Sequence, residues 1–425
     1  MSNSTGVILS APSSGAGKTT VTLGLLHALS RNGILVRGAK SGPDYIDPRF
    51  HEAACGAPCL NLDAWAMSPE RVKALAAGDG LLLIEGAMGL FDGAPPDGKG
   101  ATADLARQLN LPVVLIVDAA KTAQSIAPLV SGFVSHDPDV KVAAVILNNV
   151  GSARHETMLR NALVPLGLPV LGAIHRQNGL SHPSRHLGLV QAQEREDLSE
   201  YLSRAADTVA TTVDMEALIA LAAPVANAVT KNRFPPPAQR IAIARDAAFA
   251  FAYPHLLDDW KVAGAEISFF SPLADEAPSR TDIIFLPGGY PELYAGQLAS
   301  ASTFKSGVQN SAHSGTHVYG ECGGYMTLGD SLIDAAGHRH EMLGLLRLET
   351  SFEKRKLHLG YRTLTAKTGP FVGRFTAHEF HYATTLKAEG TPLFHARDAE
   401  GNDLEKIGLM APNVSGSFAH MIDRR

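Results

Sequence analysis

Three groups of residues in this 425-residue sequence have types and spacing that suggest chemistry. The first is the run Gly15-Ala16-Gly17-Lys18-Thr19-Thr20, which follows a short apolar stretch and opens a helical pattern. Glycines let backbone N–H groups turn toward phosphate oxygens, and a helix N-terminus favours negative charge. In such a loop the lysine neutralises phosphate charge and the next hydroxyl binds Mg²⁺. The run predicts an ATP-binding loop, although Pro12 stands where the usual pattern has its first glycine. The expected nucleotide contacts are Gly15, Gly17, Lys18, Thr19 and Thr20.

The second group consists of carboxylates at two places downstream of this loop. The turn-rich residues 40–48 contain Lys40 and two aspartates, and the apolar residues 81–84 end at Glu85. A carboxylate at the end of a buried strand beside a phosphate loop is the expected second ligand of Mg²⁺. Lys40 is expected to contact the nucleotide. The predicted metal ligands are Thr19, Asp44, Asp47 and Glu85.

Several of these polar residues also have a purely structural interpretation. Aspartates in turns commonly bond the backbone or cap a helix, so for Asp47 and Asp92 that role is nearly as well supported as a catalytic one. Asp44 has the same capping alternative. Asp118 ends another apolar run, where it would be a further acid at the sheet edge. Asn148-Asn149 ends the next run and is a candidate for contact with the nucleotide base.

The third group centres on Cys322, which lies in Gly320-Glu321-Cys322-Gly323-Gly324 between an apolar run and a helical pattern. This order predicts a strand–turn–helix elbow that presents the thiol at a sheet edge, where the helix N-terminus would lower the thiol pKa. Backbone N–H groups of the elbow, together with the glycine-rich loop 286–292, are expected to stabilise an oxyanion. The glycines around Cys322 favour a nucleophile over an inert core cysteine.

A cysteine nucleophile needs a base, and three histidines late in the chain are candidates. His420 follows a β-like segment, and His378 and His381 lie in another. Spacing alone does not choose between His381 and His420. The pair His378 and His381 resembles a zinc site only superficially, because the helical motif needs histidines four residues apart. Cys55 and Cys59 are interpreted as structural, since no neighbouring ligand pair completes a zinc set.

Short apolar runs alternate with helical patterns along the chain, which predicts two α/β units with mostly parallel sheets. A Pro-rich stretch with three consecutive prolines separates them, because such a run neither continues a helix nor joins a central strand. The predicted domains are 1–225 and 239–425, joined by a linker at 226–238. The end of the chain is expected to be more β-rich, at 343–350, 361–366 and 371–382. The expected strands are 6–10, 81–85, 113–118, 142–148, 170–174, 240–244, 266–270, 283–286 and 318–320, and the expected helices of the first half are 19–32, 101–109 and 155–163.

Composition narrows the classes of protein. The chain has 37 Lys and Arg against 42 Asp and Glu, a net charge of −5, which argues against a general nucleic-acid partner. No apolar run approaches the roughly 18 residues of a spanning helix, and the N-terminus lacks the features of a signal peptide. Three cysteines imply no disulfide framework. We therefore expect a cytoplasmic protein that binds neither nucleic acid nor membrane.

Taken together, the motifs resemble those of the cobyrinic acid a,c-diamide synthase family, most closely its aerobic-pathway branch that acts on hydrogenobyrinic acid. The runs 40–48 and 85–93 are the most diagnostic. The resemblance covers essentially the whole chain, in the order of the family. The matching segments are 11–20, 40–51, 85–93, 245–253, 286–292, 320–326, 376–382 and 416–420.

The resemblance implies a P-loop synthetase domain similar to dethiobiotin synthetase, followed by a class I glutamine amidotransferase domain with a flavodoxin-like sheet. It implies that Cys322 is the nucleophile and that His420 activates it. Ordinary amidotransferase triads carry a glutamate two residues after the histidine, but here that residue is Ile422. Whether Asp423 or another acid orients His420 stays open at this point.

The activity implied by the resemblance is amidation of the a and c acetate groups of a corrin, with ATP and Mg²⁺ as cofactors and L-glutamine as nitrogen donor. A homodimer is the family expectation. The same motifs fit two alternatives, namely the same reaction on cobalt-containing cobyrinic acid or another tetrapyrrole, and a P-loop ATPase switch whose second domain is not catalytic. Candidate substrate contacts are Tyr45, Asp92, Arg245, His378 and His381.

Overall fold

The chain forms two compact units, Met1–Lys231 and Asn232–Arg425, each of which is described here by itself. The computed structural model describes residues 4–177, 195, 197–226, 228, 230 and 233–425. Each unit is built on a largely parallel sheet, which confirms the predicted α/β class. Within the described part of the chain, no helix combines the length and the apolar character that a membrane crossing requires.

The first unit has a sheet in the order β3-β2-β4-β1-β5-β6-β7, in which all neighbouring strands are parallel. A short strand, β8 (Ala223–Pro224), pairs antiparallel with β1. The five predicted strands are present, and β2 and β3 are additional. The strands are β1 (Thr5–Ser10), β2 (Val36–Ser41), β3 (Leu60–Leu62), β4 (Leu81–Glu85), β5 (Val113–Asp118), β6 (Val142–Val150) and β7 (Val170–His175).

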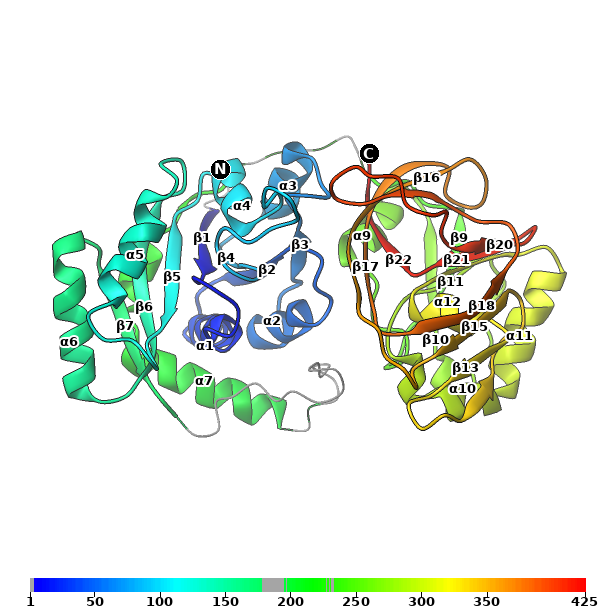
Figure 1. The fold of residues 1–425 in the computed structure, drawn as a ribbon, viewed down its shortest axis with the longest axis horizontal. Helices are drawn as coiled ribbons and strands as arrows, with labels where there is room; N and C mark the ends of the chain where they lie inside the picture. Colours follow the sequence, from blue (N-terminus) through cyan, green and yellow to red (C-terminus); the bar gives the residue numbers. More distant parts are fainter. Residues whose placement is uncertain (1–3, 178–194, 196, 227, 229, 231–232) are drawn as a thin grey trace. The chain divides into compact units, whose positions relative to one another are not determined.

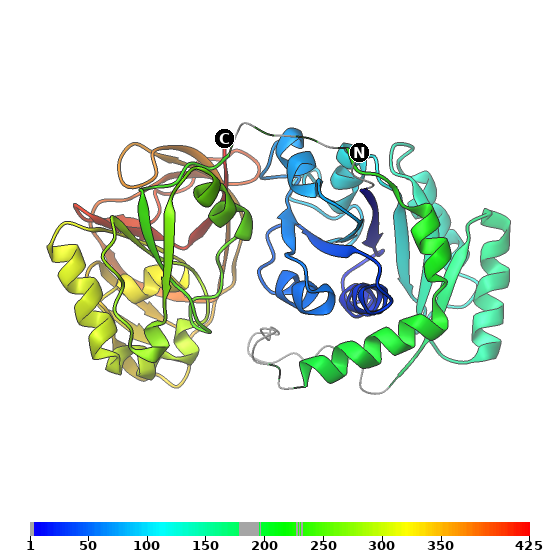
Figure 2. The same ribbon diagram turned by 180° about the vertical axis from the view of Figure 1, so that it is seen from behind.

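Helices cover this sheet, with α1 and α2 on one side and α3 and α4 on the other in Figure 1. Helix α1 begins directly after the phosphate loop, and α7 packs against it, as the dark blue and green helices of Figure 2 show. The three predicted helices of this half correspond to α1, α4 and α6. The helices are α1 (Lys18–Arg31), α2 (Asp47–Cys55), α3 (Pro69–Ala76), α4 (Thr102–Leu109), α5 (Ile126–Ser135), α6 (Ala153–Leu163), α7 (Leu198–Thr212) and α8 (Met215–Leu221).

The Pro-rich stretch is partly packed into the second unit. Phe234 is completely buried, with its ring centroid 5.5 Å from that of Phe375 and 5.8 Å from that of Phe371. Its backbone N–H donates to Asp259 Oδ2 at 2.8 Å. Residues 227, 229, 231 and 232 of the expected linker lie outside the described residues. The C-terminal part of the expected linker therefore serves as an anchor for the second core.

The second unit has a central sheet in the order β10-β9-β11-β12-β21-β20, parallel except at β20. The four predicted strands of this region are present as β9 to β12. The strands are β9 (Arg240–Ala244), β10 (Glu266–Phe270), β11 (Ile283–Leu286), β12 (His317–Glu321), β20 (Leu409–Met410) and β21 (Val414–Ser417), and the helices are α9 (Pro254–Val262), α10 (Ala295–Ser300), α11 (Ser302–His313) and α12 (Gly323–Leu328).

Two four-stranded sheets complete this unit, with the orders β14-β13-β15-β18 and β19-β16-β17-β22. They account for the β-rich character expected of the chain's end. In the second of them, β22 pairs antiparallel with β17 and places His420 opposite His378. The strands are β13 (Ser331–Ile333), β14 (Arg339–Glu341), β15 (Arg347–Ser351), β16 (His358–Ala366), β17 (Gly373–His381), β18 (Thr384–Glu389), β19 (His395–Arg397) and β22 (Ala419–Arg424).

Candidate functional sites

A cavity of about 700 Å³ opens in the first unit at the carboxyl ends of β1, β2 and β4. In a parallel sheet this is the edge at which ligands bind. The cavity brings the predicted phosphate loop together with the predicted acids. Its lining includes Gly15, Gly17, Lys18, Thr19, Thr20, Lys40, Asp44, Asp47, Glu85, Met88 and Asn148.

The phosphate loop is held in a conformation that needs glycine. Gly17 has φ 86°, and a Cβ built there would lie 2.2 Å from Asn148 Nδ2. The same Asn148 amide donates to the carbonyl oxygen of Ala16 at 2.9 Å. Asn148 therefore holds the backbone of the loop in place. The sequence had instead suggested that Asn148 contacts the base of the nucleotide. Lys18 Nζ donates to the Met88 carbonyl oxygen at 2.5 Å, and burial lowers the Lys18 pKa.

Three of the four predicted metal ligands, Thr19, Asp47 and Glu85, gather around the buried ammonium group of Lys40. Thr19 Oγ1 donates to Glu85 Oε1 at 2.6 Å, and Lys40 Nζ lies 2.9 Å from the same oxygen. Lys40 Nζ also lies 2.6 Å from Asp47 Oδ2. Burial opposes ionisation of both Lys40 and Glu85. For Lys40 the negative charges of Asp47 and Glu85 outweigh burial and raise the pKa, and for Glu85 the positive charge of Lys40 outweighs burial and lowers the pKa. A hydroxyl and two carboxylates around one cation are the donor set that Mg²⁺ prefers.

His51 belongs to this cluster and was not singled out from the sequence. It is completely buried on α2, with Nε2 2.7 Å from Glu85 Oε2 and Nδ1 3.4 Å from Cys59 Sγ. Cys55 Sγ donates to the His51 carbonyl oxygen at 3.1 Å. The two cysteines thus pack around this histidine. The only sequence signal was its place in the run 40–51, four residues after Asp47.

Asp44 and Thr20 make structural contacts at the cavity wall. Asp44 Oδ1 accepts from the Ile46 N–H at 2.7 Å and from the Asp47 N–H at 3.2 Å, so it caps the start of α2. Burial raises the Asp44 pKa to about 7. Thr20 Oγ1 lies 3.1 Å from Tyr201 Oη on α7. Both residues line the cavity, and their hydrogen bonds fix the position of its wall.

Two further acids considered from the sequence, Asp92 and Asp118, hold turns in the first unit. Asp92 Oδ2 accepts from the Gly89 N–H at 2.8 Å. Asp118 Oδ1 accepts from the Ala120 N–H and from Asn149 Nδ2, each at 3.0 Å. Neither aspartate lines the cavity. The Asp92 contact matches the turn interpretation that the sequence left open, and Asp118 stands at the end of β5, at the sheet edge.

In the second unit, Cys322 sits at a strained elbow between β12 and α12. Its backbone has φ 47° and ψ −104°, a conformation that non-glycine residues adopt at a cost of about 1–3 kcal/mol. The turn is tight because the elbow presses on the neighbouring strand, and a Cβ at Gly324 would lie 1.9 Å from the Leu286 carbonyl oxygen. Strain of this kind is concentrated at functional sites.

The thiol itself is buried, and the expectation of a lowered pKa is wrong for this structure. Cys322 is 4% exposed, and burial raises its pKa above the ordinary value. A hydrogen bond from the Gly323 N–H acts in the opposite direction and is the weaker effect. Helix α12 has only six residues, so its dipole does not offset the loss of hydration. The thiol therefore depends on a neighbouring base for activation.

His420 lies beside this thiol. A Cβ built at Gly288 would stand 2.2 Å from His420 Cε1, 3.1 Å from His420 Nε2 and 3.3 Å from Cys322 Cβ. The imidazole edge and the cysteine therefore flank the same glycine. Burial, reinforced by the charges of His378 and His381, lowers the His420 pKa to about 3.

The loop expected to supply an oxyanion donor is in place next to the elbow. A Cβ built at Gly323 would lie 3.1 Å from the backbone N of Gly289. The Gly288 carbonyl oxygen accepts from the Phe251 N–H at 2.9 Å, which anchors the loop. The loop backbone thus lies against the turn that follows the cysteine.

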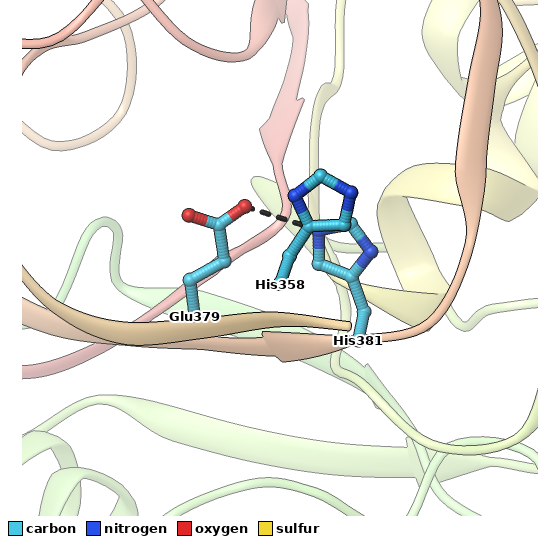
Figure 3. Close-up of side chains that lie close together, drawn as sticks. All are labelled: His358, Glu379 and His381. Atoms are coloured by element: carbon cyan, nitrogen blue, oxygen red, sulfur yellow. Dashed lines mark hydrogen bonds and ion pairs between the residues drawn. The ribbon is translucent and has the colours of Figure 1, made fainter. Parts of the chain in front are cut away.

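His381 takes part in a different cluster, shown in Figure 3, with His358 and Glu379. Their ligand atoms lie within 4.8 Å of one another. Glu379 Oε1 is 3.0 Å from His381 Nε2, and its Oε2 is 2.8 Å from Arg362 Nη2. The two imidazoles are stacked with an interplanar angle of 6°, so their in-plane lone pairs do not converge. We interpret the cluster as an ion-pair network; it shares only His381 with the pair whose metal resemblance the sequence showed to be superficial.

The candidate substrate contacts fall in both units. Tyr45 and Asp92 belong to the first unit, and Arg245, His378 and His381 to the second. The exposed Arg245 guanidinium lies 4.6 Å from the Phe269 ring centroid, and the His378 ring packs edge-on against Tyr361 at 5.3 Å. Burial lowers the His378 pKa to about 4.

Comparison with known proteins matches two parts of the chain to two different domain families. Residues 7–190 match the CobQ/CobB/MinD/ParA nucleotide binding domain, and residues 240–425 match the CobB/CobQ-like glutamine amidotransferase domain. The chain is 56% identical over 429 residues to the hydrogenobyrinate a,c-diamide synthase of Brucella anthropi, covering 98% of each chain. It is 54% identical to the protein of that name from Rhizobium meliloti, covering 98% of this chain and 99% of that one. The Mesorhizobium japonicum protein of that name is 49% identical, with 98% coverage of both.

Similarity at this level over nearly the whole length places both units within one known type of protein. The nucleotide-binding match contains the phosphate loop, and the amidotransferase match contains the cysteine elbow. The chain therefore belongs to the hydrogenobyrinate a,c-diamide synthase family, as a glutamine-dependent ligase.

Proposed function

We propose that this chain catalyses the ATP- and glutamine-dependent amidation of the a and c acetate carboxylates of hydrogenobyrinic acid, in cobalamin biosynthesis. The single observation that carries the proposal is the strained Cys322 elbow with His420 beside it, in a chain that also holds a phosphate loop. The names of the full-length relatives support the choice of substrate. The same reaction on cobalt-containing cobyrinic acid is the alternative.

In the second unit, Cys322 attacks the side-chain amide carbon of L-glutamine. Its thiol proton passes to His420 Nε2 and then to the departing nitrogen, so the C–N bond breaks and ammonia leaves. Backbone N–H groups of the elbow and of the Gly288-Gly289 loop stabilise the oxyanion. Water, deprotonated by His420, then cleaves the thioester to glutamate and restores the thiol.

In the first unit, a corrin carboxylate oxygen attacks the γ-phosphorus of ATP. The bond to the β-phosphate oxygen breaks, ADP leaves, and ammonia then displaces phosphate from the acyl phosphate to give the amide. Lys18 and the loop N–H groups hold the phosphates, and Lys40 balances the charge of the acids. Mg²⁺, held by Thr19, Glu85 and Asp47, would supply neutralising charge at the transferring phosphoryl group.

Activation of the carboxylate is chemically necessary. Hydroxide is a poor leaving group from a carboxylate, whereas phosphate is a good one. The cross-class alternative, an ATPase switch with a non-catalytic second domain, predicts ATP hydrolysis without glutaminase activity. The Cys322 elbow speaks against it, because a strained thiol has no purpose in a passive binding module.

Two substitutions test the proposal in assays with purified protein, hydrogenobyrinic acid and ATP. Cys322→Ala is expected to abolish synthesis from glutamine while leaving synthesis from ammonium salts. Lys18→Ala is expected to abolish synthesis from either nitrogen source while leaving some glutaminase activity. Retention of glutamine-dependent synthesis in Cys322→Ala, or of amidation in Lys18→Ala, would overturn the corresponding assignment. Parallel assays with the cobalt macrocycle decide between the two corrins.

The remaining expectations concern assembly and location. The homodimer and the cytoplasmic location stay predictions based on the resemblance and the sequence. Sedimentation equilibrium of the full chain tests the first, and fractionation of expressing cells tests the second.

A further inference from the structure

The position that usually carries the third member of an amidotransferase triad holds no acid in this chain. Ile422, two residues after His420, is completely buried, and its carbonyl oxygen lies 2.8 Å from His255 Nε2. It is part of the core and offers no carboxylate. Asp423, one residue further on, has Oδ1 2.9 Å from the Arg424 N–H.

A different acid approaches the imidazole from the strand that carries the nucleophile. Glu321 is the last residue of β12, directly before Cys322, and its Oε2 lies 3.8 Å from His420 Nδ1. Nδ1 is the ring nitrogen that faces the orienting acid when Nε2 serves the nucleophile. Hydrogen bonds at active sites are often long before substrate binds and tighten in the reacting complex.

The other oxygen of this carboxyl is fixed. Glu321 Oε1 accepts from the Met421 N–H at 3.2 Å and from the Tyr319 hydroxyl at 3.3 Å. Met421 directly follows His420, so one carboxyl group joins the strand of the nucleophile to the strand of the base. Tyr319 is itself held in a buried aromatic wall by Phe285 and Phe371. Glu321 therefore has little freedom to turn away from the imidazole.

From this geometry we infer that Glu321 is the positioning residue for His420, taking the place of the missing triad acid. This inference rests on the proposed glutaminase function of the second unit. The carboxylate accepts the Nδ1–H of His420, which selects the tautomer whose Nε2 lone pair faces Cys322. When Nε2 takes the thiol proton, the carboxylate balances the imidazolium charge, while its own proton count stays the same.

The chemistry of the site requires such a partner. Burial lowers the His420 pKa to about 3, so an isolated imidazole here would be a weak base. Burial also raises the Glu321 pKa to about 8, so the ionised form is the minor species at neutral pH and becomes favoured only as the neighbouring imidazolium forms. A charge created in a dry site is stabilised mainly by a fixed neighbouring charge.

The test compares Glu321→Gln with a matched control, Asp423→Asn, in the full chain. Each change is nearly isosteric, and each replaces a buried carboxyl group with an amide. For Glu321→Gln the glutaminase kcat is expected to fall about 10²-fold with an unchanged KM for glutamine, because only the base is affected. Asp423→Asn is expected to stay within about twofold of the wild type, and both variants should keep synthesis from ammonium salts.

A second measurement separates positioning from folding. In protein labelled with ¹⁵N at histidine, the His420 ring signals, assigned with His420→Gln, report the tautomer. They are expected to change in Glu321→Gln while the thermal unfolding midpoint stays close to that of the wild type. Unchanged kcat and tautomer in Glu321→Gln, or an equal loss in Asp423→Asn, would overturn the inference. Retained glutaminase in Cys322→Ala would instead overturn the proposed function on which it rests.

Discussion

Gly288 provides a sharp test of the glutaminase geometry. In Gly288→Ala the new methyl would stand 2.2 Å from His420 Cε1, so the imidazole must retreat by about 1.2 Å to reach an ordinary contact of 3.4 Å. His420 is buried in β22, and misplacement of a reacting group by about 1 Å costs about 10² in rate. The Gly288 φ is not positive, so alanine brings no backbone strain of its own.

We therefore expect the glutaminase kcat/KM of Gly288→Ala to fall at least 10²-fold, measured as glutamate release. Synthesis from ammonium salts should be retained, because the first unit is untouched. The matched control is Gly296→Ala in α10, where the nearest atom to a new Cβ is 3.7 Å away and alanine favours the helix. Wild-type glutaminase in a folded Gly288→Ala protein would refute the placement of His420 beside Cys322.

Three further predictions follow from the packing and electrostatics. Phe234→Ala should lower the free energy of unfolding of the second unit by about 3–5 kcal/mol in urea titrations, because it removes a fully buried aromatic ring. A loss below about 1 kcal/mol would mean that residue 234 does not anchor the Pro-rich stretch to the second core. His51→Leu should reduce synthesis from either nitrogen source about tenfold or more, because Glu85 loses its hydrogen-bond partner at 2.7 Å. Glutaminase activity should be unchanged. An equal loss of both activities would mean that the substitution disturbs the folding of the whole chain rather than the nucleotide site. Burial opposes ionisation of Glu379, but its hydrogen bond with His381 and the Arg362 charge lower its pKa from 4.5 to about 2. Its contribution to stability is therefore present above pH 4.5 and lost as pH falls toward 2, and Glu379→Gln should flatten the pH dependence of the urea midpoint in that range.

The sequence predicted those parts of the site that are formed by short runs of consecutive residues. The apolar run of β4 ends at Glu85, and the phosphate loop lies between a strand and a helix, so their meeting at one sheet edge followed from parallel pairing alone. The Cys322 elbow was predicted in the same way, from glycines placed around a thiol at a strand end.

What the sequence did not predict depends on contacts between distant residues. Strand β2 was missed because Arg37, Lys40 and Ser41 interrupt its apolar pattern, although pairing with β4 buries it. His51 lies 34 residues before its carboxylate partner, Glu85. The thiol pKa was predicted in the wrong direction, because local spacing reveals the helix dipole but not the depth of burial that outweighs it.

The Lys40 ammonium has a consequence for how the nucleotide pocket is assembled. Asp47 and Glu85 would repel each other if buried side by side, yet the lysine is an intrinsic counterion that keeps the local charge balanced. The first unit can thus fold to its working shape before any ligand arrives. A divalent ion that binds beside Asp47 and Glu85 would therefore enter a pocket whose acids already have a counterion, and it would add to a positive charge that the protein itself supplies.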